Sequence, residues 1–142
     1  MTRWFDRARD LRDRASISQA AAAFALTADQ STVAKTVRVY RERRDRAHEL
    51  INAIPGLSCS LPDGAFYLFP NCAGVIGKTT PDGTTIANDL YFVLYLLEKA
   101  GLASVHGGAY GLEPYFRIST ATSMEIIEQA CAQIATTVAA LK

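Results

Sequence analysis

Apolar side chains recur at helical spacing in several stretches of the chain, which predicts α-helices there. The clearest stripe lies in residues 31–54, with apolar positions three, four or seven residues apart. Its members are Val33, Val37, Tyr40, Ala47, Ile51 and Ile54. Pro55-Gly56 then ends the predicted helix, since neither residue favours its continuation. Shorter helices are predicted over residues 3–15 and over the alanine-rich residues 18–26.

Two more helices are predicted in the C-terminal half. The first covers residues 86–99 and ends at Gly101. Its inward side chains are expected to be Ile86, Leu90, Val93, Leu94 and Leu97. The second opens with a capping box from Thr122 to Glu125. Its buried face is expected to consist of Ile127, Ala130, Ile134, Val138 and Leu141.

Four short segments between these helices are predicted strands. Residues 57–61 and 65–69 flank an Asp63-Gly64 turn, which favours a two-residue hairpin that pairs Cys59 with Leu68. Residues 102–106 and 115–120 follow, joined by a glycine-rich loop. The order of elements predicts an α/β protein of the α+β type. We expect a small, mostly antiparallel sheet covered by helices.

Composition narrows the class of protein. The chain has 142 residues, of which 49% are hydrophobic and 20% charged, enough for the core of one compact domain and unlike a disordered chain. Fifteen basic and 14 acidic residues leave a formal charge of +1, which argues against a dedicated nucleic-acid binder. No apolar run is long enough to cross a membrane, and three aspartates in residues 1–15 argue against a transit peptide. We expect a cytoplasmic protein.

The cysteines and histidines do not indicate a metal site. Cys59, Cys72 and Cys131 are odd in number and far apart, so we expect small buried side chains rather than a disulfide framework or a zinc site. His48 and His106 have no partner at metal-ligand spacing. His48 is expected on a helix surface, whereas His106 could line a site beside the glycine loop.

Two glycine-containing segments resemble phosphate-binding motifs without matching them. Gly77-Lys78-Thr79 lacks the required glycine five positions earlier, where Cys72 stands. The glycines of segment 107–111 have the wrong spacing for a dinucleotide fingerprint, and a strand follows instead of a helix. A backbone connection that needs the conformational freedom of glycine is the simpler interpretation.

Arg117 is the candidate binding residue. On a strand it would face away from Phe116 and Ile118, on the opposite side of the sheet. A mid-strand arginine can face solvent or pair with an acid. Alternatively, its planar guanidinium can bind a carboxylate through two parallel hydrogen bonds. The sequence pattern leaves both possibilities open.

Four segments occur in an order that resembles a known family. They are Ser16-Ile17-Ser18-Gln19-Ala20-Ala21, Tyr40-Arg41-Glu42-Arg43-Arg44-Asp45, Pro62-Asp63-Gly64-Ala65-Phe66-Tyr67, and the long segment from His106 through the glycine loop to Phe116-Arg117-Ile118-Ser119. Together they resemble the C-terminal part of the class I aminotransferases, especially the bacterial aspartate aminotransferases. The resemblance covers about residues 16–142.

The resemblance implies a fold and a role for Arg117. Family members are dimeric pyridoxal-phosphate enzymes of fold type I, with a large cofactor domain and a small C-terminal domain. They transfer amino groups from amino acids to 2-oxo acids. Arg117 matches the arginine that binds the substrate α-carboxylate. By the same resemblance, residues 1–30 form a helical N-terminal segment, with 1–15 unmatched and 16–30 a remnant of the large domain, and residues 31–142 form the small domain.

The family lysine that forms the Schiff base has no counterpart in this sequence. That lysine precedes the segment matching Ser16-Ile17-Ser18-Gln19, whereas Lys35, Lys78, Lys99 and Lys142 all follow it. We therefore expect no catalytic, cofactor-binding or metal-binding residue in this chain, no pyridoxal phosphate bound by the chain alone, and no activity without a large-domain chain or homodimer partner. A non-catalytic amino-acid-binding or regulatory module, or a truncated product without function, is the alternative.

Overall fold

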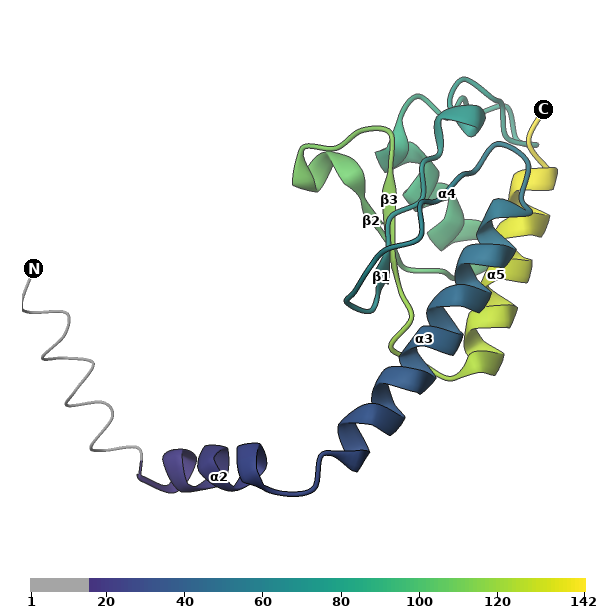
Figure 1. Cartoon of the computed structure of the whole chain (residues 1–142). Coiled ribbons are helices and arrows are strands. Elements are labelled where there is room, and N and C mark those ends of the chain that lie inside the picture. Colours follow the sequence, from purple (N-terminus) through teal and green to yellow (C-terminus); the bar gives the residue numbers. More distant parts are fainter. Residues whose placement is uncertain (1–15) are drawn as a thin grey trace, which may run out of the picture. The chain divides into compact units, whose positions relative to one another are not determined.

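The computed structural model describes residues 16–142. The chain divides after Val37 into two units. The described part of the first unit holds α2 (Ser16–Thr27) and the start of α3 (Ser31–Asn52). The second unit, residues 38–142, contains the rest of α3 followed by β1 (Tyr67–Leu68), η1 (Ala73–Val75), α4 (Asp89–Ala100), β2 (Val105–His106), η2 (Gly107–Tyr110), β3 (Phe116–Ser119) and α5 (Met124–Ala139) (Figure 1). The helix predicted over residues 3–15 lies outside the described residues.

α2 forms where the alanine-rich sequence predicts it, but it buries none of its side chains. Ile17 is 86% exposed and Phe24 is 73% exposed. An apolar helix of this kind normally packs against another surface. Within the described residues, its stability therefore depends on helix propensity rather than on burial.

The sheet has three strands in the order β1-β3-β2, and both pairings are antiparallel. Tyr67 of β1 lies opposite Ser119, and Val105 of β2 lies opposite Arg117. Because side chains alternate along a strand, Phe116 and Leu68 share one face, whereas Arg117 points to the other. The predicted small antiparallel sheet is confirmed.

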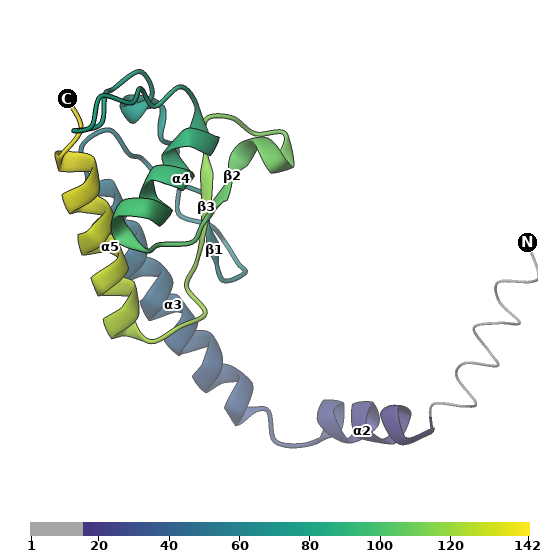
Figure 2. The same cartoon turned by 180° about the vertical axis from the view of Figure 1, so that it is seen from behind.

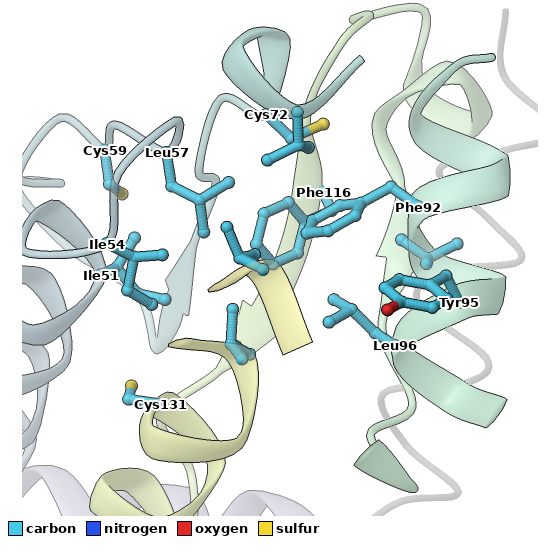
Figure 3. Close-up of a cluster of buried hydrophobic side chains, with 14 of the residues drawn as sticks. Ile51, Ile54, Leu57, Cys59, Cys72, Phe92, Tyr95, Leu96, Phe116 and Cys131 are labelled. Carbon is cyan, nitrogen blue, oxygen red and sulfur yellow. The ribbon is translucent and has the colours of Figure 1, made fainter. Parts of the chain in front are cut away.

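α3, α4 and α5 lie on the face of the sheet that carries Phe116, and the views from front and back agree on this layering (Figures 1 and 2). Phe116 is fully buried and meets the ring of Phe92 from α4 edge-on, with 5.3 Å between ring centroids. A salt bridge of 2.8 Å between Arg46 and Glu128 joins α3 to α5. The core fills the space between the three helices and the sheet (Figure 3).

The hairpin predicted at Asp63-Gly64 is wrong in its pairing. The predicted register places Cys59 opposite Leu68. In the structure, Ser58 instead pairs with Asn71 in an isolated bridge, and the strand that contains Leu68, β1, pairs with β3. The side chain of Asn52 explains part of this difference. Its Nδ2 donates to the Cys59 carbonyl at 3.0 Å, and its Oδ1 accepts from the Cys59 amide at 2.9 Å. The backbone of Cys59 therefore has partners at the end of α3.

The predicted inward face of α4 is also largely wrong. Leu90, Leu94 and Leu97 are 40–49% exposed. Val93 is buried as predicted, and so is Ile86, which precedes the helix. The side chains that face the core from α4 are Asp89, Phe92, Val93, Tyr95 and Leu96. Leucines line both sides of this helix, so the periodicity alone does not decide which side faces the sheet.

α3 begins at Ser31 as predicted, whereas the starts of α4 and α5 depart slightly from their sequence signals. α4 begins at Asp89 rather than near Ile86, and the side chain of Asn88 caps it by accepting a hydrogen bond from the Tyr91 amide. α5 is capped by Ser123, one residue after the predicted cap Thr122. An N-cap side chain satisfies amides that have no partner within the helix, so these two residues fix where the helices begin.

The three cysteines are buried, as predicted. Burial raises the pKa of the Cys72 thiol to about 12 and that of Cys131 to about 11, and it also raises the pKa of Cys59. None of the helices in residues 16–142 is both long and apolar enough to cross a bilayer.

Truncating the two faces of α4 should have different costs. Leu96 is fully buried and Leu94 is 47% exposed. We expect Leu96→Ala to lower the free energy of unfolding by about 2–5 kcal/mol, because it leaves a cavity in the core. The matched variant Leu94→Ala should cost less than about 1 kcal/mol. Denaturant unfolding followed by circular dichroism measures both, and equal losses would contradict the observed orientation of α4.

The thiols should react slowly in the folded protein. At pH 8 the pKa values of about 11 and 12 keep Cys131 and Cys72 protonated, and the thiolate is the reactive form. We expect a colorimetric thiol reagent to modify the cysteines much more slowly in buffer than in denaturant. Rapid modification of Cys72 under native conditions would contradict its burial.

Candidate functional site

Arg117 lies in the middle of the central strand, on the face of the sheet opposite the helices. Its side chain is half-buried. The guanidinium carbon is 4.4 Å from the centroid of the Tyr67 ring and 5.0 Å from that of Tyr110. Cation–π attraction to two rings restricts the movement of the guanidinium group.

The two tyrosines come from opposite neighbours of β3. Tyr67 belongs to β1 and lies across from Ser119, two residues beyond Arg117 on the same face. Tyr110 ends η2, which directly follows β2. Phe69 supports Tyr110 from the side, with their ring centroids 5.7 Å apart in an edge-on arrangement. The strand order therefore brings both rings to the arginine between them.

The charge of Arg117 is not neutralised by an acid within residues 16–142. Arg44 pairs with Asp45, and Arg46 pairs with two glutamates, but no carboxylate in this part of the chain lies within salt-bridge distance of Arg117. Aromatic faces attract the cation while leaving the N–H groups at its edge available. The arrangement suits a planar anion that accepts two parallel hydrogen bonds.

The glycine loop is shaped by close approach of its backbone. The Gly107 amide donates to the Tyr115 carbonyl at 2.6 Å, and the Gly107 carbonyl accepts from the Leu112 amide at 3.1 Å. A Cβ atom at Gly107 would lie 2.0 Å from the Leu112 carbonyl oxygen. Gly111 adopts a positive φ of 71°. The prediction that this connection needs glycine is confirmed, with lack of space as the cause at Gly107 and left-handed backbone at Gly111.

His106 does not join the Arg117 site. It lies opposite Phe116 in the sheet register, so it is on the face that the helices cover. Its Nδ1 atom is 3.9 Å from Oδ1 of the buried Asp89. Within the described residues, no three His, Cys, Asp or Glu side chains gather closely enough to hold a metal ion.

Two cavities in the described part of the chain lie away from Arg117. One, of about 180 Å³, lies among α3, β3 and α5 and is mostly apolar, with Ile118 and Ile134 in its lining. It offers no basic group to an anion. Another, of about 250 Å³, lies beside α4 and carries the acidic side chains Asp82 and Glu98. Neither cavity offers an anion what the open face around Arg117 offers, a guanidinium between two aromatic rings.

Sequence reasoning identified Arg117 but missed the tyrosines that enclose it. The alternation of β3 predicted its face correctly, whereas the positions of Tyr67 and Tyr110 depend on strand order and on the path of the glycine loop. An aromatic residue inside a glycine-rich loop, next to a strand with an unpaired arginine, is the signal that could have suggested Tyr110.

Comparison with known proteins gives the same assignment as the motifs. The sequence pattern of the family described as "Aminotransferase class I and II" matches residues 3–134. The chain is 47% identical over 119 residues to the "Probable aspartate/prephenate aminotransferase" of Rhizobium leguminosarum bv. phaseoli, which covers 84% of this chain and 30% of that protein.

Solved structures of aspartate aminotransferases share the fold. The enzyme from Rhizobium meliloti superposes with a TM-score of 0.87 at 43% identity, covering 93% of this chain and 34% of that one. An aspartate aminotransferase from Thermus thermophilus, solved with maleate, has a TM-score of 0.64 at 29% identity and covers 76% of this chain and 25% of that one.

Fold, motif order and family match together define an α+β portion of a class I and II aminotransferase. The chain belongs to this family, and it spans about 30% of the length of the curated relatives that it matches.

The fit around Gly107 gives a test of the loop geometry. We expect Gly107→Ala to lower the free energy of unfolding by about 1–3 kcal/mol, because its Cβ collides with backbone at Leu112. Gly64→Ala is the matched control, since nothing lies within 4 Å of a Cβ there. Its cost should stay within about 0.5 kcal/mol. Thermal or denaturant unfolding measures both variants, and a neutral Gly107→Ala would contradict this loop structure.

Proposed function

We propose that this chain supplies the substrate-carboxylate site of an aminotransferase that transfers amino groups from amino acids to 2-oxo acids, with Arg117 as the binding residue. The main support is the position of the Arg117 guanidinium, which two tyrosine rings enclose and no acid in residues 16–142 neutralises. Residues 31–142 correspond in this proposal to the small C-terminal domain.

The names of relatives support a dicarboxylic substrate. Aspartate and prephenate, which are named for the Rhizobium leguminosarum relative, both carry two carboxylates, and so does the maleate of the Thermus thermophilus structure. Arg117 would bind one carboxylate in a bidentate manner, which fixes the orientation of the substrate as well as its position. The second carboxylate requires a further cation that the proposal does not assign to this chain.

The described residues do not fit pyridoxal phosphate, the cofactor that the family implies. Lys99 pairs with Asp82 at 3.3 Å, and the cations that lie over the Tyr67 and Tyr110 rings within residues 16–142 come from Arg117 and not from a lysine. The N-terminus of α4 begins with the buried Asp89, and the first turn of α5 carries Glu125. Acidic side chains at helix starts oppose a phosphate there. We therefore assign no cofactor step to these residues.

In this proposal, the chain does not transfer amino groups alone. The Schiff-base lysine and the cofactor site belong to the remaining part of an aminotransferase, supplied by a large-domain chain or within a dimer. The carboxylate site itself needs no such partner, because Tyr67, Tyr110 and Arg117 all lie in residues 38–142. This completeness also favours a second candidate function, a non-catalytic module that binds amino acids.

Binding of L-aspartate and succinate to the full chain tests the role of Arg117. We expect Arg117→Met to weaken binding by about 10-fold or more, since hydrogen bonds to charged groups contribute about 1.5–3 kcal/mol. Arg43→Met is the matched control, because the Arg43 guanidinium also lies over a ring, that of Tyr40 at 5.6 Å. The affinity of Arg43→Met for both ligands should stay within about 2-fold of the wild-type value. Chemical-shift titration by NMR measures all three proteins.

Two results would contradict the proposal. Equal weakening by Arg117→Met and Arg43→Met would show that general positive charge, rather than this site, attracts the ligands. If neither L-aspartate nor succinate binds saturably to the wild-type chain, the result favours a truncated product without function. Succinamide, the neutral analogue of succinate, controls for binding that does not depend on the carboxylates.

A further inference from the structure

We propose that Asp89 is a positioning residue for Arg117: its carboxyl group holds the glycine loop in place, and the loop holds the Tyr110 ring against the guanidinium. The expected effect of Asp89 on carboxylate binding rests on the proposed function of Arg117. The contacts that carry it lie within residues 38–142. Asp89 belongs to α4 and Tyr110 to η2, so the effect passes between two elements.

Asp89 occupies an unusual environment for a carboxyl group. It is only 1% exposed and is the first residue of α4. Burial of an acid is costly unless hydrogen bonds or favourable charges compensate it. The helix start provides part of that compensation, because its amides favour negative charge. A further part comes from outside the helix, where the Gly108 amide donates to Asp89 Oδ2 at 2.9 Å. His106 Nδ1 lies 3.9 Å from the other carboxylate oxygen, Oδ1.

The hydrogen bond to Gly108 is not a helix cap. The preceding residue, Asn88, already caps α4 by accepting from the Tyr91 amide. Asp89 instead reaches a loop 19 residues later in the sequence. A side chain that served only the helix start would face its own amides or solvent. The buried contact with Gly108 therefore indicates a role in fixing the loop.

The side chains of Glu113 and His106 lie close to Gly108. A Cβ at Gly108 would lie 2.7 Å from Glu113 Oε1 and 3.0 Å from His106 Nδ1. The Gly108 carbonyl also accepts from the Gly111 amide at 3.1 Å, which closes the turn around Tyr110. Displacement of Gly108 would therefore move Tyr110, whose ring centroid lies 5.0 Å from the Arg117 guanidinium carbon.

The loop passes around the edge of the sheet between two environments. Asp89 and His106 lie on the face that the helices cover, where the negative charge of Asp89 adds to burial in raising the pKa of Cys72. Tyr110 lies with Arg117 on the opposite face. Asp89 can therefore affect the guanidinium without touching the bound carboxylate, which is why it is a positioning residue rather than a catalytic one.

The first measurement needs no ligand. In the wild-type full chain we expect nuclear Overhauser contacts between the Tyr110 ring and the Arg117 side chain, and slow hydrogen exchange at the Gly108 amide. Asp89→Ala should lose the contacts and raise the Gly108 exchange rate by about 10-fold or more, the equivalent of about 1.4 kcal/mol of lost local protection. Asp89→Asn should keep both, since its amide oxygen still accepts from Gly108.

A second substitution guards against loss of folding. Asp89→Ser keeps a polar side chain suited to a helix start but shortens it, so that it no longer reaches Gly108. It should reproduce the loop changes of Asp89→Ala while the core resonances stay dispersed. Unchanged contacts and exchange in both shortened variants would overturn the inference, as would rapid Gly108 exchange in the wild-type chain.

The affinity for L-aspartate tests the link from loop to binding. Tyr110→Leu removes the ring and should weaken binding by about 3-fold or more, a loss within the range of a cation–π contact, whereas Tyr110→Phe should retain it. Asp89→Ala and Asp89→Ser should approach Tyr110→Leu, with Asp89→Asn near wild type. If the Asp89 variants lose the Tyr110–Arg117 contacts but bind L-aspartate as tightly as the wild type does, the inference is overturned and the proposed function is not.

The proposed function and the inference can fail separately. If the wild-type chain keeps the Tyr110–Arg117 contacts, loses them on Asp89→Ser and yet binds no carboxylate, the role of Arg117 in substrate binding is wrong. The positioning of Tyr110 by Asp89 then remains supported. If Arg117→Met abolishes binding and the Asp89 variants change neither contacts nor affinity, only the inference fails.

Discussion

The packing of Phe116 against Phe92 is the constraint on which the rest of the site depends. Phe116 is fully buried beneath α4, and the residue after it is Arg117. A strand alternates its side chains, so burial of one residue directs the next to the opposite face. A slip of β3 by one residue would bring the guanidinium into the core without a partner. Packing on one face thus determines the position of charge on the other.

The strand order uses this constraint to enclose the guanidinium of Arg117, the proposed carboxylate site. β3 lies between β1 and β2, so its open face receives side chains from both neighbours. Tyr67 comes from the first neighbour, and Tyr110 comes from the loop that follows the second. Two residues separated by 43 positions in the sequence thereby enclose one guanidinium. The same arrangement with β3 at an edge would leave one side of Arg117 without a neighbouring strand.

The sequence predicts features governed by local repetition better than those governed by tertiary choice. The alternation of side chains around Arg117 follows from spacing within one segment, and so do helices α3 and α5. The structure confirms all three. Spacing alone does not determine which face of α4 is buried, because leucines on both sides of the helix satisfy the same periodicity. Asp89 has no sequence signal beyond an acid at a helix start. Its role depends on a glycine loop that folding brings beside it.

The use of tyrosines rather than acids around Arg117 has a functional consequence. An acidic partner would fix the guanidinium, but it would compete with an incoming carboxylate for the same N–H groups. Aromatic faces attract the cation without occupying those donors. The guanidinium can therefore be held in place while its N–H groups stay available, provided that the rings themselves are fixed. Strand pairing fixes Tyr67, and the half-exposed Tyr110 depends on its loop. A buried carboxyl group bound to that loop meets this requirement while remaining on the far side of the sheet from the proposed carboxylate site.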